Sequence, residues 1–101
     1  MSLDQLRYFV AVAEEGHLTR AAQRLHIAQP PLSRQIRALE EELGVALFER
    51  TSKGMKPLEP AKVLLARARV ILSEIDATVL AVRCADDPKL VADGDGPREG
   101  E

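Results

Sequence analysis

The sequence predicts a mainly α-helical fold, and three observations lead to this prediction. Apolar residues recur at helical spacing in four separate runs that together occupy most of residues 3–83. Only three aromatic residues are present, so the core must consist largely of Leu, Ile, Val and Ala, which suits packed helices. One short stretch, residues 45–58, carries turn residues between two apolar segments and therefore predicts a β-hairpin.

The first 44 residues are expected to form three helices, over residues 3–15, about 18–25, and about 31–43. Gly16 and Gly44 follow the first and third helices and suit the left-handed position that ends a helix. The apolar faces that would meet in a common core contain Leu3, Leu6, Phe9, Val10, Ala13, Leu18, Ala21, Ala22, Leu25, Leu32, Ile36, Leu39 and Leu43. Because the second and third helices are joined by a very short connection, the pair predicts a helix-turn-helix whose second helix can enter a DNA major groove.

The polar face of the third helix is the predicted DNA-reading surface. At about 100° per residue, Pro30, Arg34 and Arg37 lie away from the apolar stripe. Gln29 and Ser33 lie on a flank near the start of the helix. Arg and Gln can contact guanine and adenine edges with two hydrogen bonds, and Ser can donate to bases or phosphates. The pattern alone also fits a helical hairpin with a solvated polar face.

Residues 45–58 are expected to form a wing, with strands over 45–50 and 55–58 joined by turn residues. Arg50, Lys53 and Lys56 would surround its tip and could reach a flanking phosphate or minor groove. A surface hairpin with solvated lysines is the alternative. Thr19, near the start of the second helix, is expected either to cap backbone N–H groups or to contact a phosphate.

The last expected helix runs from Pro60 to about Arg83 and carries more apolar surface than one small domain can cover. We therefore expect it to mediate dimerisation. Docking wholly onto its own core is the alternative, which its length of about 35 Å disfavours. The residues expected at the dimer interface are Leu64, Leu65, Ala68, Ile71, Leu72, Ile75, Val79 and Val82.

Composition excludes several classes of protein. No apolar run approaches the roughly 18 residues of a membrane span, and the N-terminus does not resemble a signal peptide. The single cysteine, Cys84, excludes a disulfide within the chain and a cysteine-rich zinc site. His17 and His26 have no partners at ligand spacing, and no catalytic constellation is present. We expect no catalytic residues, no metal and no cofactor, and a cytoplasmic protein.

Charge is unevenly distributed along the chain, although the net charge is only −2. Residues 17–70 contain ten Lys or Arg and five Asp or Glu, a balance of +5. Residues 84–101 contain two bases and six acids, a balance of −4, and are rich in Gly and Pro, which predicts disorder. The chain is therefore basic where it would meet phosphate, and the acidity lies in the tail.

The stretch RYFVAVAEEGHLTRAAQRLHIAQPPLSRQIRALEEELGVALFER resembles the N-terminal DNA-binding domain of LysR-type transcriptional regulators. The blocks AA-x-x-L-H, QPPLSRQI, LE-x-ELG and LFER occur together, in order and at the family's spacing. The resemblance continues through TSKGMKPL into the long helix and covers about residues 1–83. It implies a winged helix-turn-helix, long linker helices that pair antiparallel between two subunits, and binding to an imperfect palindrome near a promoter.

The resemblance also implies roles for single residues. Gln29, Pro30, Ser33 and Arg34 match recognition-helix positions that meet DNA, Arg50 and Lys53 match the basic wing, and Thr19 matches the start of the second helix. Together with two residues on the third helix, the predicted DNA-binding set is Thr19, Gln29, Pro30, Pro31, Ser33, Arg34, Arg37, Arg50 and Lys53. We divide the chain into a DNA-binding domain (1–58), a linker helix (59–83) and a tail (84–101).

Two features depart from the family. Where the family has a Leu-Thr-x-Ala-Gly block, this chain has Leu58-Glu59-Pro60-Ala61-Lys62, with Glu59 in place of the capping threonine and Lys62 in place of the glycine. The sequence does not continue into the effector-binding domain of the family, so we expect either a fragment or a naturally short chain without a small-molecule effector site. The acidic tail does not resemble the start of that domain, which favours the naturally short chain. We expect the chain to bind promoter DNA as a homodimer or a tetramer. The alternative is a short modulator that forms mixed dimers with a full-length relative.

Overall fold

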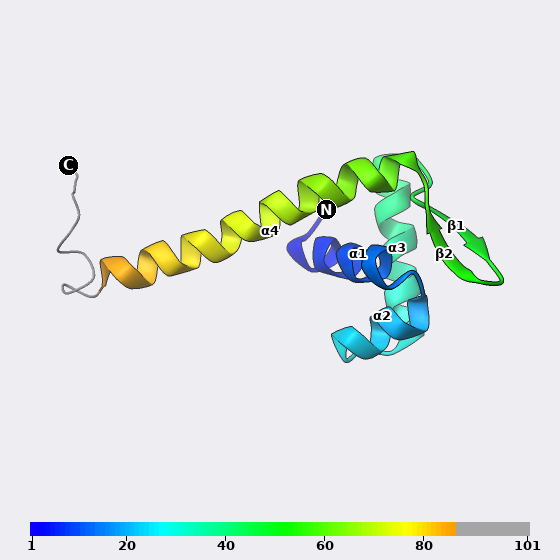
Figure 1. Ribbon diagram of the computed structural model, residues 1–101, viewed down its shortest axis with the longest axis horizontal. Coiled ribbons are helices and arrows are strands. Elements are labelled where there is room, and N and C mark those ends of the chain that lie inside the picture. The colour runs from blue at the N-terminus through cyan, green and yellow to red at the C-terminus, as the bar shows by residue number, and fades with distance from the viewer. Residues whose placement is uncertain (87–101) are drawn as a thin grey trace.

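Four helices and one antiparallel hairpin make up residues 1–86, the part of the chain that the computed structural model describes (Figure 1). The elements are α1 (Leu3–Glu15), α2 (Leu18–Leu25), α3 (Gln29–Leu43), β1 (Phe48–Thr51), β2 (Gly54–Pro57) and α4 (Glu59–Ala85). The helices α1 to α3 and the hairpin gather at one end, and α4 projects away from them (Figure 1). This arrangement produces an elongated shape of 56 × 26 × 18 Å. The predicted mainly helical fold is confirmed.

The bounds of α1 and its terminal signals agree with the prediction. The Ser2 hydroxyl accepts a hydrogen bond from the Gln5 amide, and the Gln5 side chain accepts one from the Ser2 amide, which together form a capping box. At the other end Gly16 has φ +73° and donates its N–H to the Val12 carbonyl. Gly44 ends α3 in the same way, with φ +73°. Both glycines therefore take the left-handed conformation that the sequence predicts.

The connection between α2 and α3 is shorter than expected. The helix α2 ends at Leu25 as predicted, and His26 caps it with a left-handed φ of +59°. The helix α3 begins at Gln29, two residues before the predicted start, so Pro30 and Pro31 both lie within its first turn. The N–H groups of a first turn have no partner within the helix, so the missing donors of two prolines cost nothing there.

The core lies where α1 packs against α2, α3 and α4. The α3 residues Leu32, Ile36 and Leu39 are fully buried, which confirms the predicted apolar face of this helix. Phe9 of α1 packs against Phe48 of β1, with ring centroids 5.6 Å apart and planes tilted by 43°. Leu3 and Leu43 were expected in the core, but they lie near helix ends and are exposed.

The hairpin is shorter than predicted, and a carboxylate of α3 binds the backbone where β1 begins. Strand β1 begins at Phe48 rather than at residue 45, and it pairs with β2 from Phe48↔Pro57 to Thr51↔Gly54. The Glu40 carboxylate accepts hydrogen bonds from the backbone N–H groups of Leu47 (2.8 Å) and Phe48 (3.3 Å). Glu40 of α3 thus binds the backbone N–H groups of the first strand residue and of the residue before it.

The helix α4 begins at Glu59, the bound predicted for the linker helix and one residue before the expected first helical residue Pro60, and it ends two residues later than predicted. Its N-cap is Leu58, whose carbonyl accepts from the N–H groups of Ala61 (2.9 Å) and Lys62 (3.2 Å). Glu59 is therefore the first helical residue. The comparison with the family's capping threonine had placed Glu59 at the cap, which is wrong. Cys84 and Ala85 are helical, so these residues do not belong to a disordered tail. Residues 87–101, which carry the rest of that prediction, lie outside the described residues.

Part of the predicted dimer stripe packs onto the chain's own core, which corrects the prediction. Ala68 has no exposed surface, and Leu64, Leu65 and Leu72 are half-buried against the core. Ala61 and Ala68 are small, buried and seven residues apart, so they let α4 approach the core closely. Beyond Leu72 the same stripe continues through Ile75, Val79 and Val82, on the part of α4 that projects past the body (Figure 1).

No helix within residues 1–86 combines the length and the apolar character that a membrane span needs.

Candidate nucleic-acid interface

The outer face of α3 is polar and open to solvent. Its inner face is held in the core by Leu32, Ile36 and Leu39, so the helix cannot rotate about its axis without exposing them. Arg34 and Arg37 are exposed on the outer side, in agreement with the predicted geometry. At the start of the helix Gln29 and Pro30 are exposed, while Pro31 and Ser33 are half-buried.

The wing lies directly beside the start of α3. The Arg50 guanidinium of β1 donates to the Ser33 hydroxyl at 3.5 Å and lies 3.8 Å from the Met55 sulfur. Thr19, Gln29 and Arg50 line one depression, although they come from α2, α3 and β1. The structure therefore brings four of the predicted DNA-binding residues to one place. The Arg50–Ser33 contact has no signal in the sequence.

Thr19 does not cap α2. The N-cap of this helix is His17, and no side chain accepts a hydrogen bond from the first turn. The capping alternative for Thr19 is wrong, because the residue lies inside the helix rather than before it. Its side chain is exposed at the same depression as Arg50.

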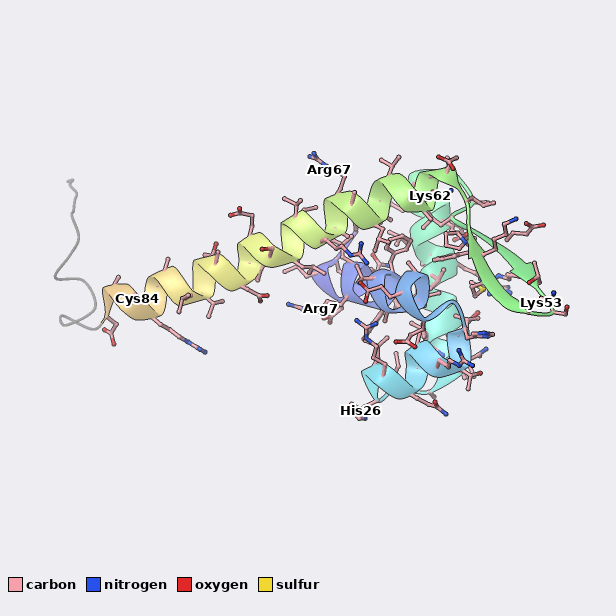
Figure 2. The ribbon with its side chains drawn as sticks, viewed as in Figure 1. Arg7, His26, Lys53, Lys62, Arg67 and Cys84 are labelled. Atoms are coloured by element: carbon pink, nitrogen blue, oxygen red, sulfur yellow. The ribbon has the colours of Figure 1, made fainter. Side chains whose placement is uncertain are left out.

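Lys53 occupies the tip of the hairpin, as predicted (Figure 2). The Thr51 hydroxyl donates to the Gly54 carbonyl (3.2 Å) and accepts from the Lys53 N–H (3.2 Å), which orders the turn. The ammonium group is exposed at the end farthest from α4 (Figure 2). The ammonium group can therefore contact a part of a bound partner that lies beyond the reach of α3.

The wing is fixed to the connection between α1 and α2 at one glycine. The Met55 N–H donates to the Gly16 carbonyl at 2.8 Å. Gly54, directly before it, has φ +133°, and a Cβ there would overlap the Gly16 carbonyl and lie 2.9 Å from the His17 ring. The sequence predicted a turn at this glycine but did not show that the turn docks against another element.

The basic side chains divide into two groups. Among residues 1–86, the Arg and Lys side chains in ion pairs are Arg7, Arg24, Lys62 and Arg69. None of the ion pairs in this part of the chain involves Arg34, Arg37, Arg50 or Lys53. The cations on α3 and the wing are therefore free to bind an anionic partner, whereas Arg24 and Arg69 are neutralised between α1, α2 and α4.

One carboxylate holds two of the neutralised arginines. Hydrogen bonds from Arg69 and then Arg24 hold the pKa of the Glu14 carboxyl below its usual value, against a smaller opposing effect of burial. The same contact with Glu14 raises the pKa of Arg24.

No group of three or more His, Cys, Asp or Glu within residues 1–86 is arranged to hold a metal ion.

A short helix, a tight connection, a second helix with an arginine-bearing outer face, and a basic hairpin at its side define a winged helix-turn-helix of the DNA-binding kind. The family model for bacterial regulatory helix-turn-helix proteins of the lysR family matches residues 3–62 of the chain. The chain belongs to this family, and its fold is that of a LysR-type DNA-binding domain.

Similar proteins carry the names of transcriptional regulators. The chain is 49% identical to ClcR of Pseudomonas putida over 85 residues, which cover 84% of this chain and 29% of that protein. It is 55% identical to TfdT of Cupriavidus pinatubonensis over 73 residues, which cover 72% of this chain and 32% of that protein. The chain thus spans about a third of the length of these relatives or less.

A solved structure of a similar domain contains DNA. The crystal structure of the BenM DNA-binding domain with benA site 1 DNA superposes with a TM-score of 0.83 at 47% identity. The match covers 86% of this chain and 98% of that one. The predicted family and fold are therefore confirmed.

Proposed function

We propose that this chain binds promoter DNA as a dimer and reads its sequence with α3. The observation that carries the proposal is the free, exposed arginine-bearing face of α3 beside a basic wing, on a body held rigid by a buried core. The DNA complex of the similar BenM domain supports DNA as the partner. We assign the chain no catalytic activity and no cofactor, and because its partner is chromosomal DNA we place it in the cytoplasm.

In this proposal α3 lies in the major groove. Arg34 donates two hydrogen bonds to a guanine edge. Gln29 donates one hydrogen bond to an adenine edge and accepts one from it, because these side chains match the two-bond patterns of those bases. Arg37, Pro30 and Pro31 border the same face of α3. In the proposal, these residues on the outer face of α3 determine which DNA sequence the domain prefers.

The remaining contacts would position the domain without reading bases. Arg50, held beside Ser33, and Lys53, at the wing tip (Figure 2), would bind backbone phosphates on the wing side of the site read by α3. Thr19 would donate its hydroxyl to a phosphate near the same depression. Contacts of this kind supply much of the affinity and make it fall steeply with salt.

The proposed dimer forms through the projecting part of α4. Val79 is 44% exposed there, and Ile75 and Val82 continue the stripe at helical spacing. Ile71 is also exposed and borders it. A second copy would cover these residues and place two α3 helices about 34 Å, or a multiple of it, apart on DNA. Tetramers would require a further contact between such dimers.

A salt titration tests the proposal. Binding to the DNA upstream of the chain's own coding sequence is compared with binding to a scrambled duplex of equal length, and light scattering during size-exclusion chromatography measures the mass of the same sample. We expect a dimer that prefers the native duplex and loses affinity with salt. Equally weak binding to both duplexes would contradict the proposal and favour mixed dimers with a full-length relative, in which only the α4 surface is used.

A further inference from the structure

Glu14 connects three helices that are far apart in the sequence. One carboxylate oxygen, Oε2, accepts from Nη2 (2.7 Å) and Nε (3.3 Å) of Arg69 in α4. The other, Oε1, lies 2.8 Å from Nη2 of Arg24 in α2. Glu14 itself belongs to α1, and its side chain is 30% exposed. The carboxylate therefore joins the first helix of the helix-turn-helix to α4 through a single residue.

The position of Arg69 along α4 makes this contact a second point of attachment. The first is the junction at Leu58, where α4 follows β2. Arg69 is ten residues beyond Glu59, which corresponds to about 15 Å along the helix axis. Between the two points Ala61 and Ala68 are small and buried, so they allow close packing but offer no polar group that would resist sliding or tilting.

From this geometry we infer that Glu14 is a positioning residue, which sets the angle between α4 and the DNA-reading body and thereby the half-site spacing that a dimer accepts. The inference rests on the proposed dimer through α4. The apolar contacts of α4 hold it against the body but have no preferred direction, whereas the ion pair fixes one point of the helix relative to α1 and α2. The ion pair supplies the directional contact, because Arg69 donates two hydrogen bonds to one oxygen.

The length of α4 converts a small tilt into a large displacement. Its 27 residues extend over about 40 Å, so a tilt of about 10° at the junction moves the far end by about 7 Å. This displacement corresponds to about two base-pair steps of 3.4 Å. A partner bound along the projecting part of α4 would move with it, and its α3 would meet the DNA at a different spacing.

The neighbouring residue provides a matched control. Glu15 lies 3.3 Å from Arg24 and forms no ion pair with α4 within the described residues. Glu15→Gln therefore changes the charge of the chain as Glu14→Gln does, but leaves the contact with Arg69 intact. Arg69→Gln breaks the same contact from the other side and changes the charge in the opposite direction.

The test uses the full chain and the half-site that the wild type selects from a random duplex library. Duplexes carry two inverted copies of this half-site with the spacer varied by one base pair at a time, and a further duplex carries one copy. We expect Glu14→Gln and Arg69→Gln each to reduce the preference for the best spacing over its neighbours by about threefold, the effect of one exposed ion pair. The double variant should lose no more than either single variant.

Affinity for the single half-site should stay at the level of the Glu15→Gln control, which should also retain the wild-type spacing profile. A wild-type spacing profile in Glu14→Gln would overturn the inference and leave the proposed function standing. Equal flattening of the spacing profile in Glu14→Gln and in the Glu15→Gln control would do the same. A wild type that selects no half-site would contradict the proposed function itself. A wild type that selects a half-site but accepts all spacings equally would overturn the inference alone.

Discussion

Replacing Gly54 by alanine should detach the wing from the body. The backbone there has φ +133°, a conformation that costs a residue with a Cβ about 1–3 kcal/mol. The new Cβ would also overlap the Gly16 carbonyl oxygen, which accepts the Met55 N–H at 2.8 Å. Loss of that hydrogen bond adds about 1 kcal/mol. We therefore expect Gly54→Ala to lower the free energy of unfolding by about 2–4 kcal/mol.

Urea denaturation followed by circular dichroism measures this loss at one fixed protein concentration, since dimerisation makes stability depend on concentration. Gly44→Ala is the matched control, because Gly44 has φ +73° but no atom lies within 4 Å of its added Cβ. The control should lose about 1–2 kcal/mol, the cost of the left-handed backbone alone. A Gly54→Ala variant that loses no more than Gly44→Ala would refute the docking of the wing on the α1–α2 connection.

Three further results are expected. Val79→Asp should convert the dimer into a monomer in light scattering, because it places a charge on the projecting stripe. Ala77→Asp, about 200° away around the same helix, should remain a dimer. If the two variants have the same mass, the stripe is not the dimer interface. Lys53→Ala should weaken binding to all duplexes and make the slope of log K against log [salt] shallower by about 0.9, and an unchanged slope would exclude a phosphate contact. The pKa of Glu14 is lowered in the folded protein, so its carboxylate should stabilise the fold at pH values above the ordinary pKa of 4.5. The difference in stability between wild type and Glu14→Gln should therefore vanish as the pH falls through the lowered pKa, and a difference that does not change with pH would contradict this.

Local sequence patterns were sufficient for the elements whose determinants are local. The bounds of α1 and α2 and the left-handed Gly16 and Gly44 agree with the structure, because spacing and terminal glycines depend on the neighbouring residues. The outer face of α3 is likewise as predicted, since burial of Leu32, Ile36 and Leu39 determines which side faces solvent.

Features that depend on distant residues could not be predicted in this way. Helical periodicity shows that a face of α4 is apolar but not what covers it, so Ala68 was assigned to the dimer although α1 covers it. Glu14 and Arg69 are 55 residues apart, and nothing in their local patterns indicates that they meet. The docking of Gly54 on Gly16 is a close backbone contact, which the sequence shows only as a turn glycine.

Sequence reading by α3 is tested by comparing wild type and Arg34→Ala on the selected half-site and on every single-base variant of it. Arg34 is exposed on α3 and, within residues 1–86, forms no ion pair, so we assign it to a base edge. We expect a loss of about 1–3 kcal/mol in binding and the disappearance of base preference at one position only, with the preferences elsewhere retained. Equal weakening of binding to all the variants, with every base preference unchanged, would contradict sequence reading by this face of α3.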